Sequence, residues 1–316
     1  MSAGWVAGTV RARAMARRRL GRQAAHELAS QPSLATALAL LSTSAYGRDL
    51  QGLSRLADAQ RAVAATALWH LRILAGWLPP GGADQLRAVA AWYELANIED
   101  RLASLAGDDV AQPFELGALA SSWRRVSPGS SVSAVRSGLA ASPWGDPGAD
   151  EIGPIGVALR MAWARRLASD AAGASSWAAG RGALLVAGIL AGGLRSGKGT
   201  TPGQALPGGA VASARRLLGS GWQDASTLAE LTTRLPGSAA WALEGTTAPE
   251  DLWRAELGWW NRVESDGLTA RTATAGPGPE PVVGMAAALV ADAWRVGAAL
   301  EAAARGGDPG LADALA

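Results

Sequence analysis

The feature that most constrains the fold of this 316-residue chain is a faint motif that recurs along it. The first copy consists of Ser33, Leu34, Ala37, Leu41, Ser44, Tyr46 and Gly47. A second copy follows 98 residues later, at Ser131, Val132, Val135, Leu139, Ser142, Trp144 and Gly145. A third begins after a further 96 residues, with Thr227, Leu228, Leu231, Leu235, Ser238 and, one place late, Trp241. Apolar residues at i, i+3 and i+7 before a polar stop indicate a short helix in each copy.

The rest of the chain also has helical periodicity. One helical face is predicted by Val63, Ala67, Leu71, Leu74 and Leu78, before the break at Pro79-Pro80-Gly81-Gly82. Further helices are expected at 86–105, at 177–194 and near the C-terminus, where Met285, Leu289, Val296 and Leu300 share the period. Clear strand alternation is absent, and Phe and Tyr are scarce, so the sequence predicts an all-α protein.

The recurring motif predicts three similar helical modules with pseudo-threefold symmetry. We place them at residues 1–110, 111–205 and 206–316, as one compact repeat protein. An arginine pair precedes each copy in a segment that we expect to be helical: Arg18-Arg19, Arg124-Arg125 and Arg215-Arg216.

Composition excludes several classes of chemistry. The chain has no Cys and only two His, which argues against a metal site, so we expect no metal and no cofactor. Its net charge is only +2, and 18% of its residues are charged. A nucleic-acid-binding protein usually has a stronger positive excess, so we expect no nucleic-acid partner. The low charge is compatible with surface that is buried against partner proteins.

We also expect no membrane-spanning segment. The longest apolar stretch, at 183–194, is shorter than a span of about 20 residues and is interrupted by glycines. The basic start is not followed by the continuous apolar segment of a secretory signal, so we expect a cytoplasmic protein.

Several segments resemble the C-subunit family of the V/A-type rotary ATPases, whose eukaryotic member is the d subunit of V-ATPase. The resemblance is fullest over residues 5–105, at Val10-Arg11-Ala12-Arg13-Ala14-Met15, at 33–47, at Leu71–Pro79 and at Trp92-Tyr93-Glu94-Leu95-Ala96-Asn97-Ile98. The last segment is similar to an aromatic-acid-x-x-Asn helix of that family, and 278–305 resembles its closing helix. The segment 177–194 departs from the family pattern, with Ala and Gly where an acid and Asn are usual.

The resemblance implies a mechanical role. Members of this family resemble a funnel of three helical modules whose base sits on the membrane proteolipid ring and whose open end receives the central shaft. The resemblance implies a peripheral, non-catalytic rotor component that transmits torque, with no catalytic residue of its own. Two other hypotheses remain open: a nucleotide-dependent phosphotransferase and a stand-alone helical scaffold.

The phosphotransferase hypothesis depends on the Gly-rich segment 192–201. It has the spacing of a phosphate loop up to Lys198, but Gly199 stands where Ser or Thr would bind magnesium. The apolar run Leu184–Leu190 before it can be read as a strand, yet Thr201-Pro202-Gly203 breaks any following helix. We therefore expect a loop between modules.

The remaining candidates have structural interpretations that we prefer. We expect the arginine run Arg11, Arg13, Arg17, Arg18, Arg19 and Arg22 to form a solvated or partner-contact helix rather than a phosphate-binding patch. His70 is expected to be a hydrogen-bonded core histidine, and His26 to lie near a helix end. Glu99-Asp100 and Asp108-Asp109 are expected to be surface acids. Gly180, Gly182, Gly188 and Gly192 predict close packing on their helix.

Overall fold

The computed structural model describes residues 3–196, 201–272, 276–307 and 309–315. These residues fold entirely as helices and connecting turns, with no strand among them, so the predicted all-α class is confirmed. The chain divides into two compact units, residues 1–86 with 260–316 and residues 87–259. The division falls within two long helices, α5 (Gly82–Leu105) and α14 (Leu252–Thr272). These boundaries differ from those of the three predicted modules, which stay a prediction.

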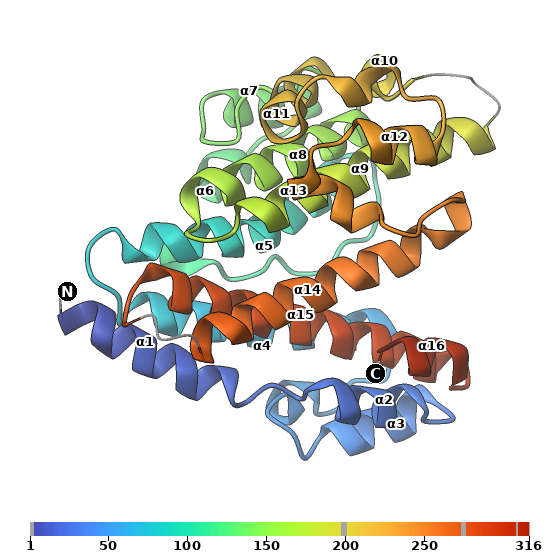
Figure 1. Ribbon diagram of the computed structural model, residues 1–316. Coiled ribbons are helices and arrows are strands. Elements are labelled where there is room, and N and C mark those ends of the chain that lie inside the picture. Colours follow the sequence, from blue (N-terminus) through green and yellow to red (C-terminus); the bar gives the residue numbers. More distant parts are fainter. Residues whose placement is uncertain (1–2, 197–200, 273–275, 308, 316) are drawn as a thin grey trace. The chain divides into compact units, whose positions relative to one another are not determined.

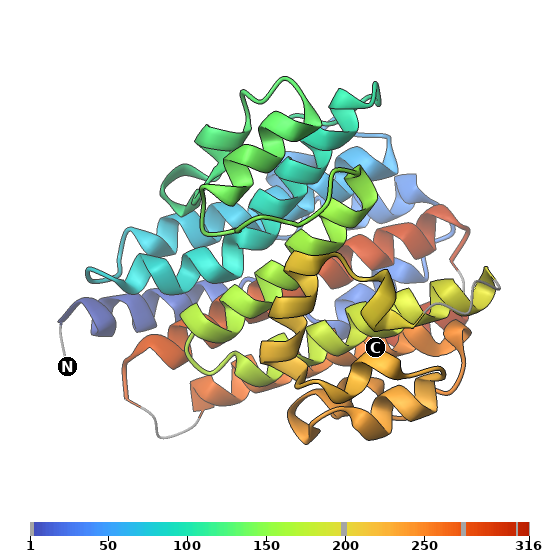
Figure 2. The ribbon, with the colours of Figure 1, turned by 90° about the horizontal axis from the view of Figure 1, so that it is seen from above.

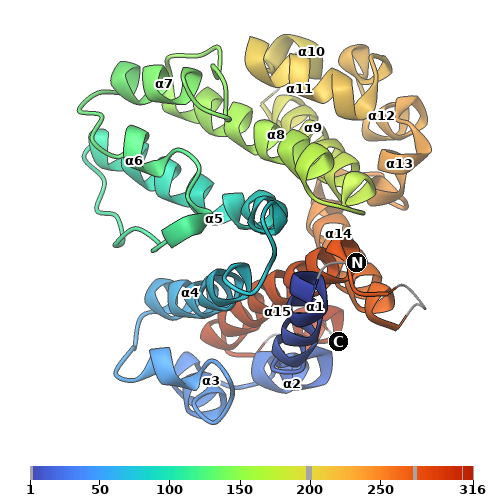
Figure 3. The same ribbon diagram turned by 90° about the vertical axis from the view of Figure 1, so that its left-hand side faces the viewer.

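The first unit is built around one buried helix. Figure 3 shows that helix, α15 (Pro279–Ala304), with α4 (Leu56–Ala75) on one side and α1 (Ala3–Ala16) and α2 (Arg22–Ala29) on the other. The shorter helices α3 (Leu34–Leu41) and α16 (Pro309–Leu315) also contact α15, and a 3₁₀ turn at Gly47–Leu50 packs on α4. Figure 1 labels these elements along the chain.

Small residues let α15 pack closely. Its Pro279 occupies the first turn, where a missing N–H costs nothing. At Gly267 of α14, an added Cβ would lie 2.2 Å from the carbonyl oxygen of Gly284, so the two backbones meet at a pair of glycines. Most of the α15 side chains are Ala, Val or Leu and are buried, which makes this helix the core of the unit.

The second unit is built around two adjacent helices, α8 (Ile152–Asp170) and α9 (Ser175–Arg195). The helix α11 (Gly208–Leu218) packs on both, and α13 (Gly237–Ala240) packs on α9. Figure 2 shows this gold-to-orange region lying along α9. The other short helices of the second unit are α6 (Trp123–Val126), α7 (Val132–Ala140), α10 (Pro202–Ala205) and α12 (Leu228–Arg234), with 3₁₀ turns at Gly117–Leu119, Gly221–Asp224, Trp241–Leu243 and Pro249–Asp251.

Tryptophan side chains bridge the long helices of the second unit by hydrogen bonds and ring packing. The Nε1 of Trp163 on α8 donates to the carbonyl of Ala88 at 3.2 Å, and that of Trp259 donates to the carbonyl of Trp177 at 2.8 Å. The Trp163 ring also packs on Trp92, with ring centroids 5.1 Å apart. Buried indoles of this kind supply apolar area while their N–H groups stay satisfied.

The helices predicted from periodicity are confirmed. Val63, Ala67, Leu71 and Leu74 lie on α4, but the helix ends at Ala75, so the prediction is wrong for Leu78, which lies beyond it. The predicted 86–105 helix extends back to Gly82. Within the described part of the chain, two helices, α9 and α15, are long and apolar enough to cross a membrane by length and composition alone. In α15, 83% of that apolar window is buried within the structure, as in the core helix of a globular domain.

Candidate functional site

The three copies of the motif share the same start. Each begins with a hydroxyl N-cap: Ser33 accepts from the backbone N–H of Thr36 at 3.2 Å, and Ser131 accepts from that of Ala134 at 3.2 Å. Thr227 accepts from the backbone N–H of Glu230 at 3.1 Å. An N-cap hydroxyl satisfies one of the free N–H groups of a helix start. The predicted short helices are thus α3, α7 and α12.

The first two copies also end in the same way. The hydroxyl of Ser44 donates to the carbonyl of Leu41 and accepts from the N–H of Tyr46, at 2.7 and 3.1 Å. The hydroxyl of Ser142 makes the corresponding bonds with Leu139 and Trp144, at 2.7 and 3.2 Å. These bonds fix the turn that places an aromatic side chain against a long helix.

In the first unit, that aromatic side chain reaches a buried carboxylate. Tyr46 donates its hydroxyl to Asp292 Oδ2 at 2.8 Å, and Asp292 is fully buried on α15. The same carboxylate accepts the backbone N–H groups of Leu20 and Gly21, both at 2.8 Å, just before α2 begins. Asp292 therefore anchors the start of one short helix and the end of the next.

In the second unit, Glu94 on α5 has the corresponding position and is also fully buried. Its Oε1 accepts the backbone N–H groups at the start of α6, from Ser121 at 2.8 Å, Ser122 at 2.7 Å and Trp123 at 2.8 Å. Its Oε2 accepts Trp144 Nε1 at 3.1 Å and the Ser121 hydroxyl. We call Asp292 and Glu94, each with its donors, the carboxylate anchors.

The third copy ends differently. Trp241 Nε1 donates to the backbone carbonyl of Ser238 at 2.9 Å. Its ring packs on α9, where a Cβ added at Gly180 would lie 2.7 Å from the ring atom Cζ2. The glycine therefore leaves the space that the indole fills. The close packing predicted from glycines holds at Gly180 and Gly182 and is wrong at Gly188 and Gly192, where no described residue lies within 4 Å of an added Cβ.

One turn beyond each anchor stands a second polar residue. Asn97 on α5 exchanges two hydrogen bonds with the backbone of Phe114, at 2.9 and 2.7 Å. Arg295 on α15 is fully buried and donates to Glu264 Oε2 at 2.7 Å and to Asn261 Oδ1 at 3.0 Å. Its Nε and Nη1 find no hydrogen-bond acceptor among the described residues. Glu264 is thus the counterion of a buried guanidinium.

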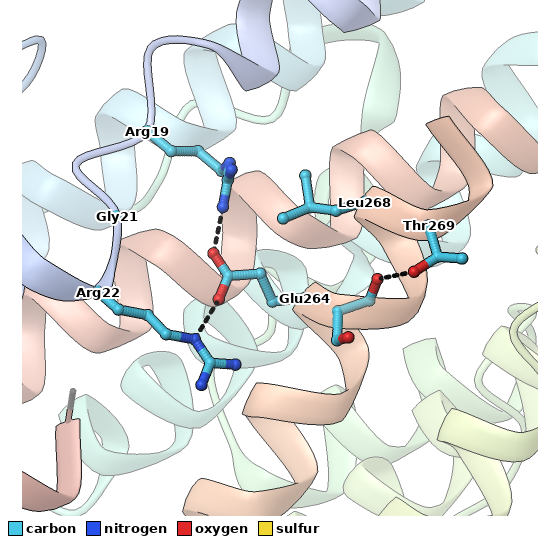
Figure 4. Close-up of a pocket in the computed structure, with 7 residues that line it drawn as sticks. Arg19, Gly21, Arg22, Glu264, Leu268 and Thr269 are labelled. Carbon is cyan, nitrogen blue, oxygen red and sulfur yellow. Dashed lines mark hydrogen bonds and ion pairs between the residues drawn. The ribbon is translucent and has the colours of Figure 1, made fainter. Parts of the chain in front are cut away.

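Glu264 also lines an open pocket of about 450 Å³ (Figure 4). Arg19 is paired with its Oε1, and Arg22 Nε lies 3.5 Å from its Oε2. Three guanidinium groups therefore share one buried carboxylate, which fixes the segment between α1 and α2 to α14. Both arginines line the pocket and point towards Glu264 (Figure 4), so the charged groups at this pocket form an ion-pair network.

The phosphate-loop candidate lies only partly within the described structure. Lys198, Gly197, Gly199 and Thr200 lie outside the described residues. The possible strand at Leu184–Leu190 is wrong, because those residues lie within α9, and Gly192–Arg195 form its last turn. A phosphate loop connects a strand to the N-terminus of a helix, whereas Gly192 and Gly193 lie at the C-terminal end of α9. The helix break expected at 201–203 is wrong, because the short helix α10 begins at Pro202.

The two histidines differ in their surroundings. His70 is buried, as predicted, but its Nδ1 has no hydrogen-bond partner in the described part of the chain, so the expectation of a satisfied side chain is wrong. Burial, reinforced by Arg18, Arg11 and Arg48, lowers the pKa of His70 below 6.5. His26, in the last turn of α2, lies 3.2 Å from the Asp313 carboxylate.

The acidic candidates separate into two groups. Asp108 and Asp109 are exposed, as predicted. Glu99 is half-buried and pairs with Arg160 at 2.9 Å, so its assignment as a surface acid is corrected. Burial raises the pKa of Glu99, and Arg160 opposes that shift. Of the arginine pairs, Arg18-Arg19 lies in the turn after α1 rather than in a helix.

The carboxylate anchors do not follow from the sequence motifs. Glu94 belongs to the aromatic-acid-x-x-Asn helix, which by itself assigns it no role, and Asp292 belongs to no motif. The signal for Asp292 is that it is the one acid in the otherwise uncharged segment 281–294. Such an acid must be paired or hydrogen-bonded when the helix is buried. Comparison of the chain with models of known protein families and with curated proteins finds no match.

Proposed function

We propose that this chain is a non-catalytic coupling component that joins the central shaft of a V/A-type rotary ATPase to its membrane proteolipid ring. The observation that carries the proposal is the repeated carboxylate anchor, with Asp292 and Glu94 making the same kind of bonds in corresponding copies of the motif. Each anchor fixes two short helices to one long helix through charge-assisted bonds to backbone N–H groups. A body that transmits torque needs such rigid joints.

The same comparison supports three similar helical modules. The N-cap bonds at Ser33, Ser131 and Thr227 agree in geometry across all three copies of the motif. The aromatic residue after each copy meets a long helix, at Asp292, at Glu94 and, for Trp241, at Gly180. We infer that the modules arose from one helical template and are arranged with pseudo-threefold symmetry, as the resemblance to the C-subunit family implies.

The direct test is purification of the tagged full chain from membranes of its own organism under mild conditions. Co-purification of the shaft proteins and the proteolipid ring is the expected result. A preparation from a strain that lacks the ring protein is the matched control, and it should yield the shaft without the ring. Recovery of the chain alone, from membranes that contain an intact ATPase, contradicts the proposal.

A second test separates coupling from phosphotransfer. Calorimetric titration of the isolated chain with magnesium and ATP is expected to show no binding, because Gly192–Arg195 belong to the end of α9. The Lys198→Ala variant serves as the comparison and is expected to behave identically. Binding that the substitution abolishes would favour the phosphotransferase.

A further inference from the structure

The helix α1 presents an unusual exposed face in the first unit. Two of its apolar side chains are largely exposed, Val6 at 44% and Val10 at 61%. The arginines Arg11, Arg17 and Arg18, which follow them in the sequence, are exposed as well. The opposite side of α1 packs closely, since a Cβ added at Gly8 would lie 2.4 Å from Leu78 Cδ2. This orientation is therefore fixed by packing.

Two exposed tryptophans, one on α4 and one just after it, lie beside exposed arginines of the same unit. Trp77 is 51% exposed, and Arg11 Cζ lies over its ring at 5.5 Å. Trp69 is 37% exposed, and Arg48 Cζ lies over its ring at 5.4 Å. We call these residues the Arg–Trp face: Val6, Val10, Arg11, Arg17, Arg18, Arg48, Trp69 and Trp77.

The Arg–Trp face is strongly positive. The first 26 residues contain six arginines and no acid, and Glu27 is the first carboxylate in the chain. Among the described residues, no ion pair holds Arg11, Arg17 or Arg18, while Arg48 lies 3.2 Å from Asp49. The positive charge also reaches the protein interior, because Arg18, Arg11 and Arg48 all act to lower the pKa of His70.

We propose that the Arg–Trp face binds the surface of a bilayer that contains anionic lipids. Guanidinium groups pair with lipid phosphates, indole rings favour the depth of the headgroups, and small apolar side chains enter the acyl boundary. Arg11 follows the exposed Val10 in the sequence and lies over the ring of the exposed Trp77, so the structure brings a guanidinium and an indole together beside the apolar part of α1. This inference goes beyond the coupling function and does not depend on it, since it concerns lipid rather than the proteins of the ATPase.

The apolar residues favour a bilayer over a nucleic acid. Arginines and tryptophans also suit single-stranded nucleic acid, through phosphate contacts and stacking. However, a guanidinium already covers one side of each indole, and a phosphate backbone offers Val6 and Val10 no apolar environment. A lipid surface accommodates every residue of the Arg–Trp face.

The test is flotation of the purified full chain with protein-free vesicles. We expect binding to vesicles of phosphatidylcholine mixed with phosphatidylserine, and little binding to phosphatidylcholine alone. Raising the salt concentration should weaken the binding, since exposed charges are screened over about 8 Å at physiological ionic strength. Inorganic phosphate at matched ionic strength should compete no better than chloride. Equal binding to both vesicle types, or none to either, overturns the proposal.

Two variants and one control assign the binding to this face. Arg17→Glu/Arg18→Glu removes two arginines that contribute about fivefold each near an anionic surface, so binding should fall by about 25-fold or more. The control Arg216→Glu/Arg254→Glu changes the net charge equally at exposed arginines of the other unit and should leave binding nearly unchanged. An equal loss in the control overturns the assignment, because it would reflect net charge alone.

The second variant distinguishes lipid from other occupants. Val6→Ser/Val10→Ser keeps every charge and should weaken vesicle binding several-fold by removing the apolar contact. Three results overturn the proposal: unchanged vesicle binding in this variant, tighter binding of wild type to a single-stranded oligonucleotide at the same salt, and a dimer in sedimentation that the variant dissociates. All of these variants alter exposed side chains, so circular dichroism should match that of the wild type.

Discussion

The carboxylate anchors of the two compact units bind the same kinds of donor but accept different numbers of hydrogen bonds. Asp292 accepts three hydrogen bonds, two from backbone N–H groups and one from Tyr46. Glu94 accepts five, including three consecutive backbone N–H groups and an indole. The longer side chain of Glu reaches around the start of α6, whereas Asp reaches only the two residues that precede α2.

The two anchors also differ in the polar residues that lie next to them on the same long helix. One turn after Asp292, the buried Arg295 enters an ion-pair network with Glu264, Arg19 and Arg22. One turn after Glu94, Asn97 makes a local pair of bonds with Phe114. In the first unit, several charges therefore act beside the Asp292 anchor, whereas in the second unit the start of α6 and the turn after α7 depend on the single carboxylate of Glu94.

The largest effect is expected from removing the Glu94 carboxylate. Glu94→Ala leaves five donors without an acceptor and should lower the free energy of unfolding by about 4 kcal/mol, whereas Asp292→Ala should cost about 3 kcal/mol. Urea denaturation measures both. If Glu94→Ala does not fold, Glu94→Gln should show faster hydrogen exchange at residues 121–123. A larger loss in Asp292→Ala would contradict the comparison.

A loss of about 3 kcal/mol is expected when the first unit's ion-pair network is broken. Glu264→Met leaves the buried Arg295 without its counterion, while the more exposed Arg19 and Arg22 can turn to solvent. Adding Arg295→Met should recover part of the lost unfolding free energy, because the buried charge is removed with its partner. Urea denaturation of the single and double variants measures both effects. A double variant that is less stable than the single one would show that Arg295 stabilises the unit by another contact.

The sequence predicted the helices well because their signals are local. The period of Val63 to Leu74 lies within a single segment, and so do the apolar i, i+3 and i+7 positions of each copy of the motif. The anchors depend on residues far apart in sequence, such as Asp292 and Leu20. A single sequence carries no signal for such a pairing, except that a buried acid needs donors.

The ion-pair network around Glu264 could not be predicted from the sequence for the same reason. Arg19 and Arg22 belong to an arginine run, and nothing in that run specifies which arginines face solvent. The structure separates Arg11, Arg17 and Arg18, which are exposed, from Arg19 and Arg22, which pair with a glutamate far along the chain. Helical spacing predicts which residues share a face, but only tertiary packing determines what each face meets.

A smaller loss of unfolding free energy, about 1.5 kcal/mol, is expected when the hydrogen bond from Tyr46 to Asp292 is removed. Tyr46→Phe removes one hydrogen bond to a charged acceptor and keeps the ring in place. Because Asp292 retains the bonds from Leu20 and Gly21, hydrogen exchange at those two amides should change little. If both amides lose protection, the tyrosine positions the carboxylate as well as binding it.

The smallest effect tests the third copy, in which the indole rests on a glycine. Gly180→Ala adds a Cβ that would lie 2.7 Å from Trp241 Cζ2, which costs about 2 kcal/mol of overpacking against a gain of about 1 kcal/mol in helix propensity. We therefore expect a net loss of about 1 kcal/mol in unfolding free energy, measured by urea denaturation. Gly188→Ala is the matched control on the same helix, and because no described residue lies within 4 Å of the added Cβ, it should stabilise the protein. If both substitutions stabilise it, the indole does not rest on Gly180, and the third copy must hold its long helix by contacts other than those of Trp241.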